Sequence, residues 1–217
     1  MRTGEVCALT WNDIDFEKGI INIERNVFSK VKDDKGRWYF GTPKTINGNR
    51  QVYMCETLIN TLKNYKKRQD KLKKEYKRNY HYYHIEDVVD KYGNVKEQRI
   101  VETKRKRKSC VDANLIFTKK DGTYIGTDLI RYPFKVIHKE LGICNCRFYD
   151  LRGSFATKSL RSGVEIKDVA AILGHSRIET TENYYISTSE EAKKEASDIF
   201  EKCVQSEIIN DIINYKL

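Results

Sequence analysis

Three kinds of side chain in the last third of the chain have the types and spacing to act on a phosphodiester. Arg152 lies in a Tyr-Asp-Leu-Arg run, His175 closes a Leu-Gly-His turn, and Tyr184 and Tyr185 follow nine and ten residues later. A guanidinium group can bind phosphate oxygens through parallel hydrogen bonds, and an imidazole can move protons near neutral pH. A tyrosine hydroxyl can attack phosphorus and form a covalent intermediate. The set therefore favours phosphoryl-transfer chemistry.

Helices must hold these groups in place. The spacing of apolar residues predicts helices over Asp128–Leu141, Tyr149–Arg161, Ile166–Leu173, Glu179–Tyr185 and Ser189 to about Glu207. Gly174 is expected to end the third of these, because glycine readily adopts the backbone conformation that terminates a helix.

The first half of the chain predicts mixed elements. A short helix is expected over Thr3–Trp11 and a long, increasingly basic helix from Glu56 to about Arg78. Strands are predicted over Ile20–Val27, Trp38–Gly41, Arg50–Met54 and Leu115–Thr118. Lys30–Arg37 is expected to be a charged connection, and Pro43 with Asn47-Gly48 to mark a hairpin connection between the second and third strands. Residues 79–112 are predicted to contain a hairpin with Tyr92-Gly93-Asn94 at its turn. The sequence thus predicts an α+β fold, mainly helical, with a small antiparallel β-sheet near the N-terminus.

Composition points to a polyanionic partner. The 217 residues carry a formal net charge of +10 and a pI of about 9.2, which favours nucleic acid. No apolar run is long enough to span a membrane and no signal peptide is recognisable, so a cytoplasmic location is expected. The six cysteines are scattered and are interpreted as reduced thiols. Cys144 and Cys146 with His138 fit no common zinc spacing, so no metal is expected there.

Four motifs occur in a fixed order. They are MRTGEVCALTWNDID from Met1, PKT around Lys44 with RQV from Arg50, DLRGSFAT around Arg152, and LGH ending at His175 and followed by the tyrosine pair. In this order they resemble the catalytic domain of the tyrosine recombinases, the phage and conjugative-transposon integrases. The resemblance extends from Arg2 to about Ala196, except for residues 79–112.

The resemblance implies a site-specific recombinase that cuts and rejoins DNA in integration and excision through a 3′-phosphotyrosine, without a metal or other cofactor. It implies six catalytic residues: Arg2, Lys44, Tyr149, Arg152, His175 and Tyr185. The two arginines and His175 would hold the scissile phosphate, Lys44 would protonate the leaving 5′ oxygen, and Tyr185 would be the nucleophile. It also implies double-stranded DNA as partner, with DNA contacts from Lys44, Arg50, Lys104, Arg105 and Lys106.

Several alternatives remain open in the sequence. Tyr149 stands where the family usually has a histidine, and it either donates a hydrogen bond to the phosphate or only packs. The nucleophile is Tyr185 or Tyr184, and Tyr185 fits the downstream spacing better. The chain could also be a DNA-binding relic of a recombinase that no longer cuts, or a strand-nicking enzyme similar to a topoisomerase.

The resemblance also gives an expectation for domain organisation. Residues 1–217 are expected to be one catalytic domain, shortened at its N-terminal side, with an insertion at about 79–112. Protomers are expected to be monomeric without DNA and to form a tetramer in the synaptic complex. The apolar tail Ile208–Leu217 is a candidate segment for docking on a neighbouring protomer.

Overall fold

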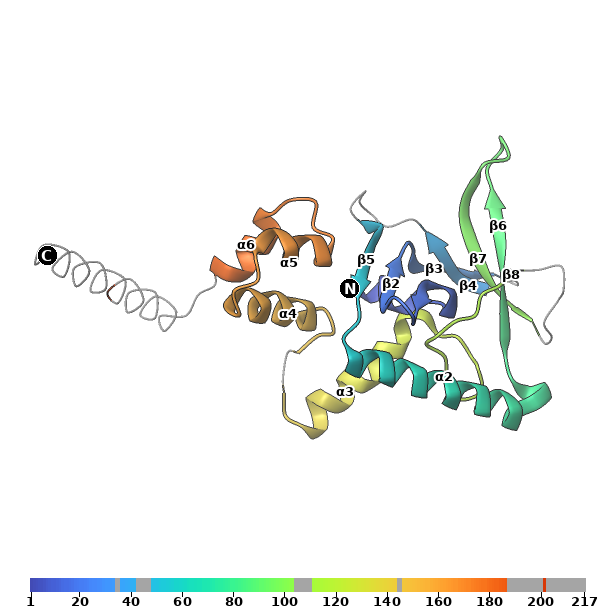
Figure 1. The fold of residues 1–217 in the computed structure, drawn as a ribbon. Helices are drawn as coiled ribbons and strands as arrows, with labels where there is room; N and C mark the ends of the chain where they lie inside the picture. The colour runs from blue at the N-terminus through green and yellow to red at the C-terminus, as the bar shows by residue number, and fades with distance from the viewer. Residues whose placement is uncertain (34–35, 42–47, 104–110, 144–145, 187–200, 202–217) are drawn as a thin grey trace, which may run out of the picture.

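The computed structural model describes residues 1–33, 36–41, 48–103, 111–143, 146–186 and 201 (Figure 1). For residues 31–33, 36 and 183–186 it describes only the course of the backbone. The predicted helix from Ser189 and the tail Ile208–Leu217 lie outside these residues, apart from position 201. No helix in the described ranges combines the length and the apolar composition needed to cross a bilayer.

A small antiparallel sheet lies near the N-terminus, as the sequence predicts. Its central strand β2 (Ile20–Ile23) pairs with β1 (Ile14–Asp15) on one side and with β5 (Arg50–Tyr53) on the other. The register places Ile23 opposite Arg50 and Asn22 opposite Gln51. Because side chains alternate along a strand, Ile23 and Arg50 project from one face, and Asn22 and Gln51 from the other.

A second antiparallel sheet makes the β-structure larger than predicted. Its strand order is β3-β4-β7-β6-β8 among the described residues. The bounds are β3 (Asn26–Asp33), β4 (Gly36–Gly41), β6 (Tyr82–Val89), β7 (Val95–Thr103) and β8 (Val111–Asp112). The hairpin predicted within 79–112 is confirmed as β6 and β7, and the Asp90 carboxylate accepts the backbone N–H groups of Tyr92 and Asn94 in its turn. The hairpin is thus a structural part of this sheet.

Three predictions about strands are wrong. Trp38–Gly41 and Arg50–Met54 do not form a hairpin, because β4 pairs with β3 and β7 whereas β5 pairs with β2. Lys30–Arg37 is largely strand, because β3 and β4 supply each other's backbone hydrogen bonds despite their charged side chains. The predicted strand Leu115–Thr118 is reduced to a bridge between Leu115 and Thr10. The predicted turn residues 42–47 lie outside the described ranges.

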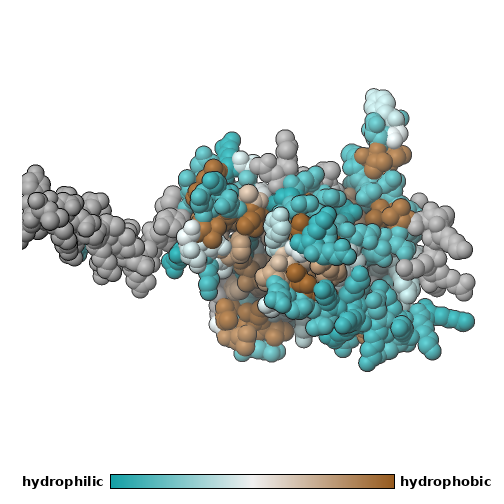
Figure 2. All heavy atoms as spheres, in the orientation of Figure 1, coloured by the Kyte–Doolittle hydropathy of each residue, from teal (hydrophilic) through white to brown (hydrophobic). Residues whose placement is uncertain are grey.

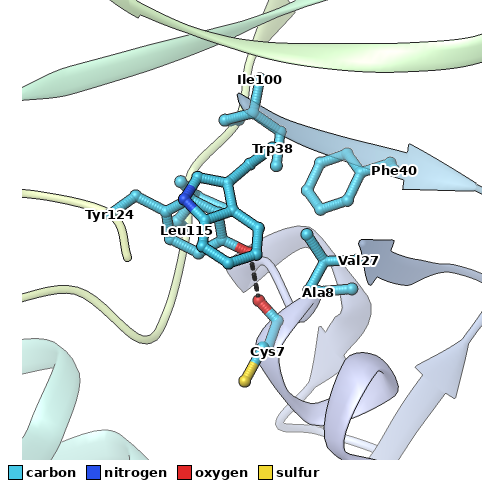
Figure 3. Packing of buried hydrophobic residues seen from close by; sticks show 9 residues of the cluster. Cys7, Ala8, Val27, Trp38, Phe40, Ile100, Leu115 and Tyr124 are labelled. Carbon is cyan, nitrogen blue, oxygen red and sulfur yellow. Dashed lines mark hydrogen bonds between the residues drawn. The ribbon is translucent and has the colours of Figure 1, made fainter. Parts of the chain in front are cut away.

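Helices at the front of the chain close two hydrophobic cores. The helix predicted over Thr3–Trp11 is split into α1 (Thr3–Cys7) and the short 3₁₀ helix η1 (Trp11–Asp13). Beside α1, one core packs Cys7, Ala8, Val27, Trp38, Phe40, Ile100, Ala113, Leu115 and Tyr124, and the Tyr124 hydroxyl donates to the Cys7 carbonyl (Figure 3). The other core packs the small sheet against α2 (Glu56–Tyr76).

The buried side chain of Gln69 links α2 by hydrogen bonds to Trp11 of η1 and to the backbone of residues 115–116. Its side-chain oxygen accepts from the Trp11 indole N–H at 2.8 Å, and its amide nitrogen donates to the carbonyls of Leu115 and Ile116 at 3.1 Å. The side chain is only 4% exposed, so these bonds satisfy polar groups that are shielded from water.

The remaining helices lead from the two cores to a group formed by the last three helices, at one end of the described part of the molecule (Figure 1). The helix predicted over Asp128–Leu141 forms as the 3₁₀ helix η4 (Gly126–Ile130) and α3 (Arg131–Glu140). Then come α4 (Asp150–Arg161), α5 (Ile166–Leu173) and α6 (Glu179–Ile186), which confirm the other three predicted helices in the described residues. The chain's N-terminus lies between these last helices and the small sheet (Figure 1). Residues distant in sequence therefore meet there.

Candidate active site

The C-terminal end of α5 brings three arginine side chains together. Arg50 Nε donates to the carbonyl of Ile172 at 2.8 Å, Arg152 Nη2 to that of Leu173, and Arg2 Nη2 to that of Gly174 at 3.2 Å. Arg2 precedes α1, Arg50 begins β5 and Arg152 lies in the first turn of α4. The final carbonyls of a helix lack partners within the helix and carry its negative partial charge, so they attract guanidinium groups.

Gly174 ends α5 and so determines which backbone carbonyls at the end of this helix can accept hydrogen bonds from the arginines. Its φ of 68° is the left-handed conformation that ends the helix, as predicted. The N–H of His175 then donates to Ala170 and that of Gly174 to Ala171, both at 3.0 Å. This termination leaves the carbonyls of residues 172–174 to bind the arginines.

Glu5 is a buried carboxylate that orders two of these arginines. It is 2% exposed, and it accepts hydrogen bonds from Arg2 Nη1 at 2.9 Å and from Arg50 Nη2 at 2.9 Å. Burial raises the Glu5 pKa, but the hydrogen bonds and charge of Arg50, with those of Arg2, outweigh it and lower the pKa to about 2. Sequence reasoning gave Glu5 no role, although it lies three residues after Arg2 within the same motif.

Arg152 is the most deeply buried of the three arginines. Its residue is 4% exposed, and its Nε and Nη1 are buried without a hydrogen-bond partner among the described residues. Burial lowers its pKa, Arg2 adds to the effect, and Glu5 and Tyr149 act in the opposite direction. Buried guanidinium donors without partners are rare, so this pair indicates a place for an anion.

His175 completes the cluster beside Arg152. It is 9% exposed, and its Nδ1 lies 2.8 Å from the hydroxyl oxygen of Thr181, a fully buried residue of α6. Burial lowers the His175 pKa to about 4, and the charges of Arg152, Arg2 and Arg50 contribute. The imidazole is therefore neutral at pH 7. The sequence analysis gave Thr181 no role, and its contact with His175 emerges from the packing of α6.

The other candidate residues occupy less defined positions. Tyr149 immediately precedes α4 and is 45% exposed, so it is not a core packing residue. Tyr184 and Tyr185 lie in α6, two turns after the loop that carries His175, and their side chains lie outside the described parts of the structure. Arg50 has a 7% exposed side chain that is paired with Glu5, and its contact with DNA stays a prediction.

Four predicted DNA-contact or catalytic positions fall in ranges that the structure does not describe. They are Lys44, Lys104, Arg105 and Lys106. Their assignments remain predictions.

The fold and the site together define a class of protein. In it, arginines cluster at the C-terminal end of a helix, a neutral histidine follows, and the next helix carries the tyrosines. Residues 1–191 match the Phage integrase family, and the chain belongs to that family of tyrosine recombinases. The prediction made from the motifs is thus confirmed.

Individual relatives agree with this membership. The chain is 30% identical over 190 residues to a "Tyrosine recombinase XerC-like" protein of Caldanaerobacter subterraneus subsp. tengcongensis, covering 85% of this chain and 42% of the relative. It is 28% identical over 176 residues to the "Prophage integrase IntR" of Escherichia coli (81% and 37%). It is 26% identical over 187 residues to the "Transposase from transposon Tn916" of Enterococcus faecalis (85% and 38%). The chain thus spans about two fifths of the length of these relatives.

Solved structures share the fold. The Tn1549 transposon integrase in complex with a circular intermediate DNA superposes with a TM-score of 0.61 at 20% identity, covering 91% of this chain and 54% of that one. XerA recombinase superposes with a TM-score of 0.54 at 22% identity, covering 92% and 53%.

Proposed function

We propose that the protein is a site-specific DNA recombinase of mobile genetic elements, and that residues 1–217 make up its catalytic domain. In this proposal it cuts and rejoins strands through a 3′-phosphotyrosine, so the energy of the phosphodiester is conserved. Residues 79–112 would be an insertion relative to the compact family core. The protein would act on double-stranded DNA as a multimer, a tetramer in the synaptic complex.

The main support for this proposal is the pair of Arg152 donors, Nε and Nη1, that have no hydrogen-bond partner among the described residues. Among the described residues of the cluster, three guanidinium groups face one carboxylate, that of Glu5, so two positive charges remain. A phosphodiester carries one negative charge, and the pentacoordinate transition state concentrates additional charge on its oxygens. A fixed cluster with two excess positive charges therefore favours the transition state over the ground state.

The remaining roles follow from chemistry at the phosphate. Neutral His175 would receive a proton or a hydrogen bond from the reacting oxygens, with Thr181 fixing the ring. Tyr185 would attack phosphorus, and Lys44 would protonate the departing 5′ oxygen. Tyr149 is exposed enough to donate its hydroxyl hydrogen to a phosphate oxygen.

Basic surface outside the cluster would hold the rest of the DNA. The surface over α2 is hydrophilic (Figure 2), and Lys67, Lys71 and Lys74 are exposed along it. Such lysines would bind backbone phosphates without reading sequence, with an affinity that falls steeply as salt rises. Lys104, Arg105 and Lys106 are proposed to act similarly.

A nicked suicide substrate tests the proposal. The full chain is incubated with duplex DNA carrying an end of the mobile element that encodes it, and the products are separated on a denaturing gel. We expect a protein–DNA band that survives denaturation and disappears in Tyr185→Phe. Tyr184→Phe is the matched control, because it removes the neighbouring hydroxyl and should leave the band intact.

The other outcomes are equally informative. Loss of the band only in Tyr184→Phe would move the nucleophile by one position. DNA binding without a covalent band in any version would contradict the proposed activity and favour a DNA-binding relic. In that case Tyr149→His would be the first reversion to test.

A further inference from the structure

A polar hollow lies between the two sheets and borders Arg50, one member of the arginine cluster. Primary amide side chains from separate segments converge on it: Asn22 of β2, Asn49 and Gln51 around the start of β5, and Gln98 of β7. Arg50, which pairs with Glu5, also lines the hollow. Nothing in the proposed strand-transfer chemistry uses these amides.

Two of the amides form a matched pair. Asn22 and Gln51 are opposite one another on β2 and β5, and the Gln51 amide nitrogen donates to the Asn22 side-chain oxygen at 2.9 Å. This bond leaves the amide nitrogen of Asn22 as donor and the amide oxygen of Gln51 as acceptor, both on the exposed face of the small sheet. If both amides were rotated, one donor and one acceptor would still remain.

The charges around the hollow disfavour a phosphate as its ligand. Arg25 is paired with Asp13 and its guanidinium stacks over Phe40, and Arg50 is paired with Glu5. The exposed carboxylate of Glu24 also lines the hollow and would repel a phosphate. A neutral group with its own donors and acceptors suits this environment better.

We propose that Asn22 and Gln51 read the edge of a base close to the scissile phosphate. This inference rests on the proposed recombinase function and adds a specificity determinant to it. Gln51 follows Arg50 in β5, with Cα atoms about 3.8 Å apart, but their side chains project from opposite faces of the small sheet. The base is therefore placed within several pairs of the cleavage point and not directly at it.

The donor and acceptor select particular bases. Adenine presents an acceptor and a donor side by side in the major groove, at N7 and N6. Guanine presents an acceptor and a donor in the minor groove, at N3 and N2. A well-placed contact of this kind discriminates against other bases by roughly 5- to 150-fold. We therefore expect a purine preference at one position.

The test randomises four base pairs on each side of the cleavage position in the suicide substrate. DNA captured covalently by the full chain is sequenced, and so is DNA bound without cleavage in a gel shift. The proteins compared are the parent, the Asn22→Thr/Gln51→Thr double variant, Gln51→Glu, and Asn60→Thr. Asn60 is an exposed amide on α2 and serves as the matched control.

The expected result is local. The parent should prefer adenine or guanine at one position, and Asn60→Thr should retain that preference. The double variant should lose the preference at that position alone, because threonine keeps the strand but cannot make the paired contact. Gln51→Glu should shift the preference toward cytosine, since two acceptors then face the base and cytosine offers the N4 donor. Replacement by 7-deazaadenine or inosine at the preferred position identifies the groove.

Two results would overturn the inference while leaving the recombinase function in place. One is covalent capture by the double variant with the parent's preferences unchanged at all randomised positions. The other is efficient capture by the parent without any preference. If the parent forms no covalent product, the proposed function fails, and the base preference is then decided from the DNA bound without cleavage.

Discussion

Replacement of Glu5 by glutamine tests whether the arginine cluster depends on one buried carboxylate. Glutamine has nearly the same shape, but it cannot neutralise Arg2 and Arg50, whose guanidinium groups both lie 2.9 Å from the carboxylate oxygens. Removal of one member from a buried ion pair costs about 3–5 kcal/mol, because the remaining charge stays buried without compensation.

The pKa of Glu5 gives an independent magnitude. It is lowered from 4.5 to about 2, a difference that corresponds to about 3 kcal/mol in favour of the ionised form in the folded protein. For a chain of this size, that loss lowers Tm by about 6–12 °C. Both routes predict a loss of about 3 kcal/mol in the free energy of unfolding for Glu5→Gln at pH 7.

The sign of the pH dependence follows from linkage. A carboxylate whose folded-state pKa is lowered stabilises the fold above its unfolded pKa, and this contribution disappears as pH falls through the folded pKa. The difference between the parent and Glu5→Gln should thus be constant from pH 7 to 5 and fall by roughly half at pH 3.

Urea unfolding followed by circular dichroism measures this difference. Asp70→Asn is the matched control, because Asp70 is 53% exposed and pairs with Lys73 at 3.0 Å on the surface of α2. It should change stability by less than about 0.5 kcal/mol. A loss below about 1 kcal/mol in Glu5→Gln, or a loss that does not change between pH 7 and pH 3, would refute the reasoning.

Three further predictions concern neighbouring parts of the molecule. Arg152→Lys should slow strand cleavage by about 10²–10³-fold in single-turnover assays, because lysine keeps the charge but not the planar fork of donors. An unaltered rate would show that Arg152 does not bind the scissile phosphate. His175 should make the protein less stable as pH falls from 6.5 to 4, by up to about 3 kcal/mol in the free energy of unfolding. The pKa of His175 is about 4 in the folded protein and 6.5 in the unfolded chain, so the unfolded chain binds the proton more tightly. Urea unfolding should show a smaller loss of stability between pH 6.5 and 4 in His175→Gln than in the parent, because the variant keeps only the pH dependence of other groups such as Glu5. Gln69→Leu should cost about 2–4 kcal/mol in the same assay, since the Trp11 indole and nearby carbonyls lose their buried partner, and a neutral effect would mean that the site admits water.

Much of the candidate site could be predicted from local sequence. The helices that carry Arg152 and His175 follow from apolar spacing and from Gly174, which terminates α5 with a φ of 68°. The opening motif around Arg2 is long enough to indicate the family, which the match over residues 1–191 confirms. These features depend on a few neighbouring residues, so they can be recognised without knowledge of the fold.

Strand pairing could not be predicted in the same way. Trp38–Gly41 and Arg50–Met54 are close in sequence, yet β4 and β5 belong to different sheets. Either partner would satisfy their backbone hydrogen bonds, and the choice depends on which face buries its apolar side chains against the rest of the chain. Local sequence signals identify the strands, but they do not show which pairing buries the apolar side chains better.

The sequence by itself determined which residues could perform the chemistry and in what order they occur. Only the tertiary structure decided how they are held: Glu5 bridges Arg2 and Arg50, and the carbonyls at the end of α5 bind guanidinium groups from three distant elements. A carbonyl group is present at every position, and a glutamate is common on any surface. Burial and orientation at the junction of the small sheet and α5 give these ordinary groups their electrostatic effect.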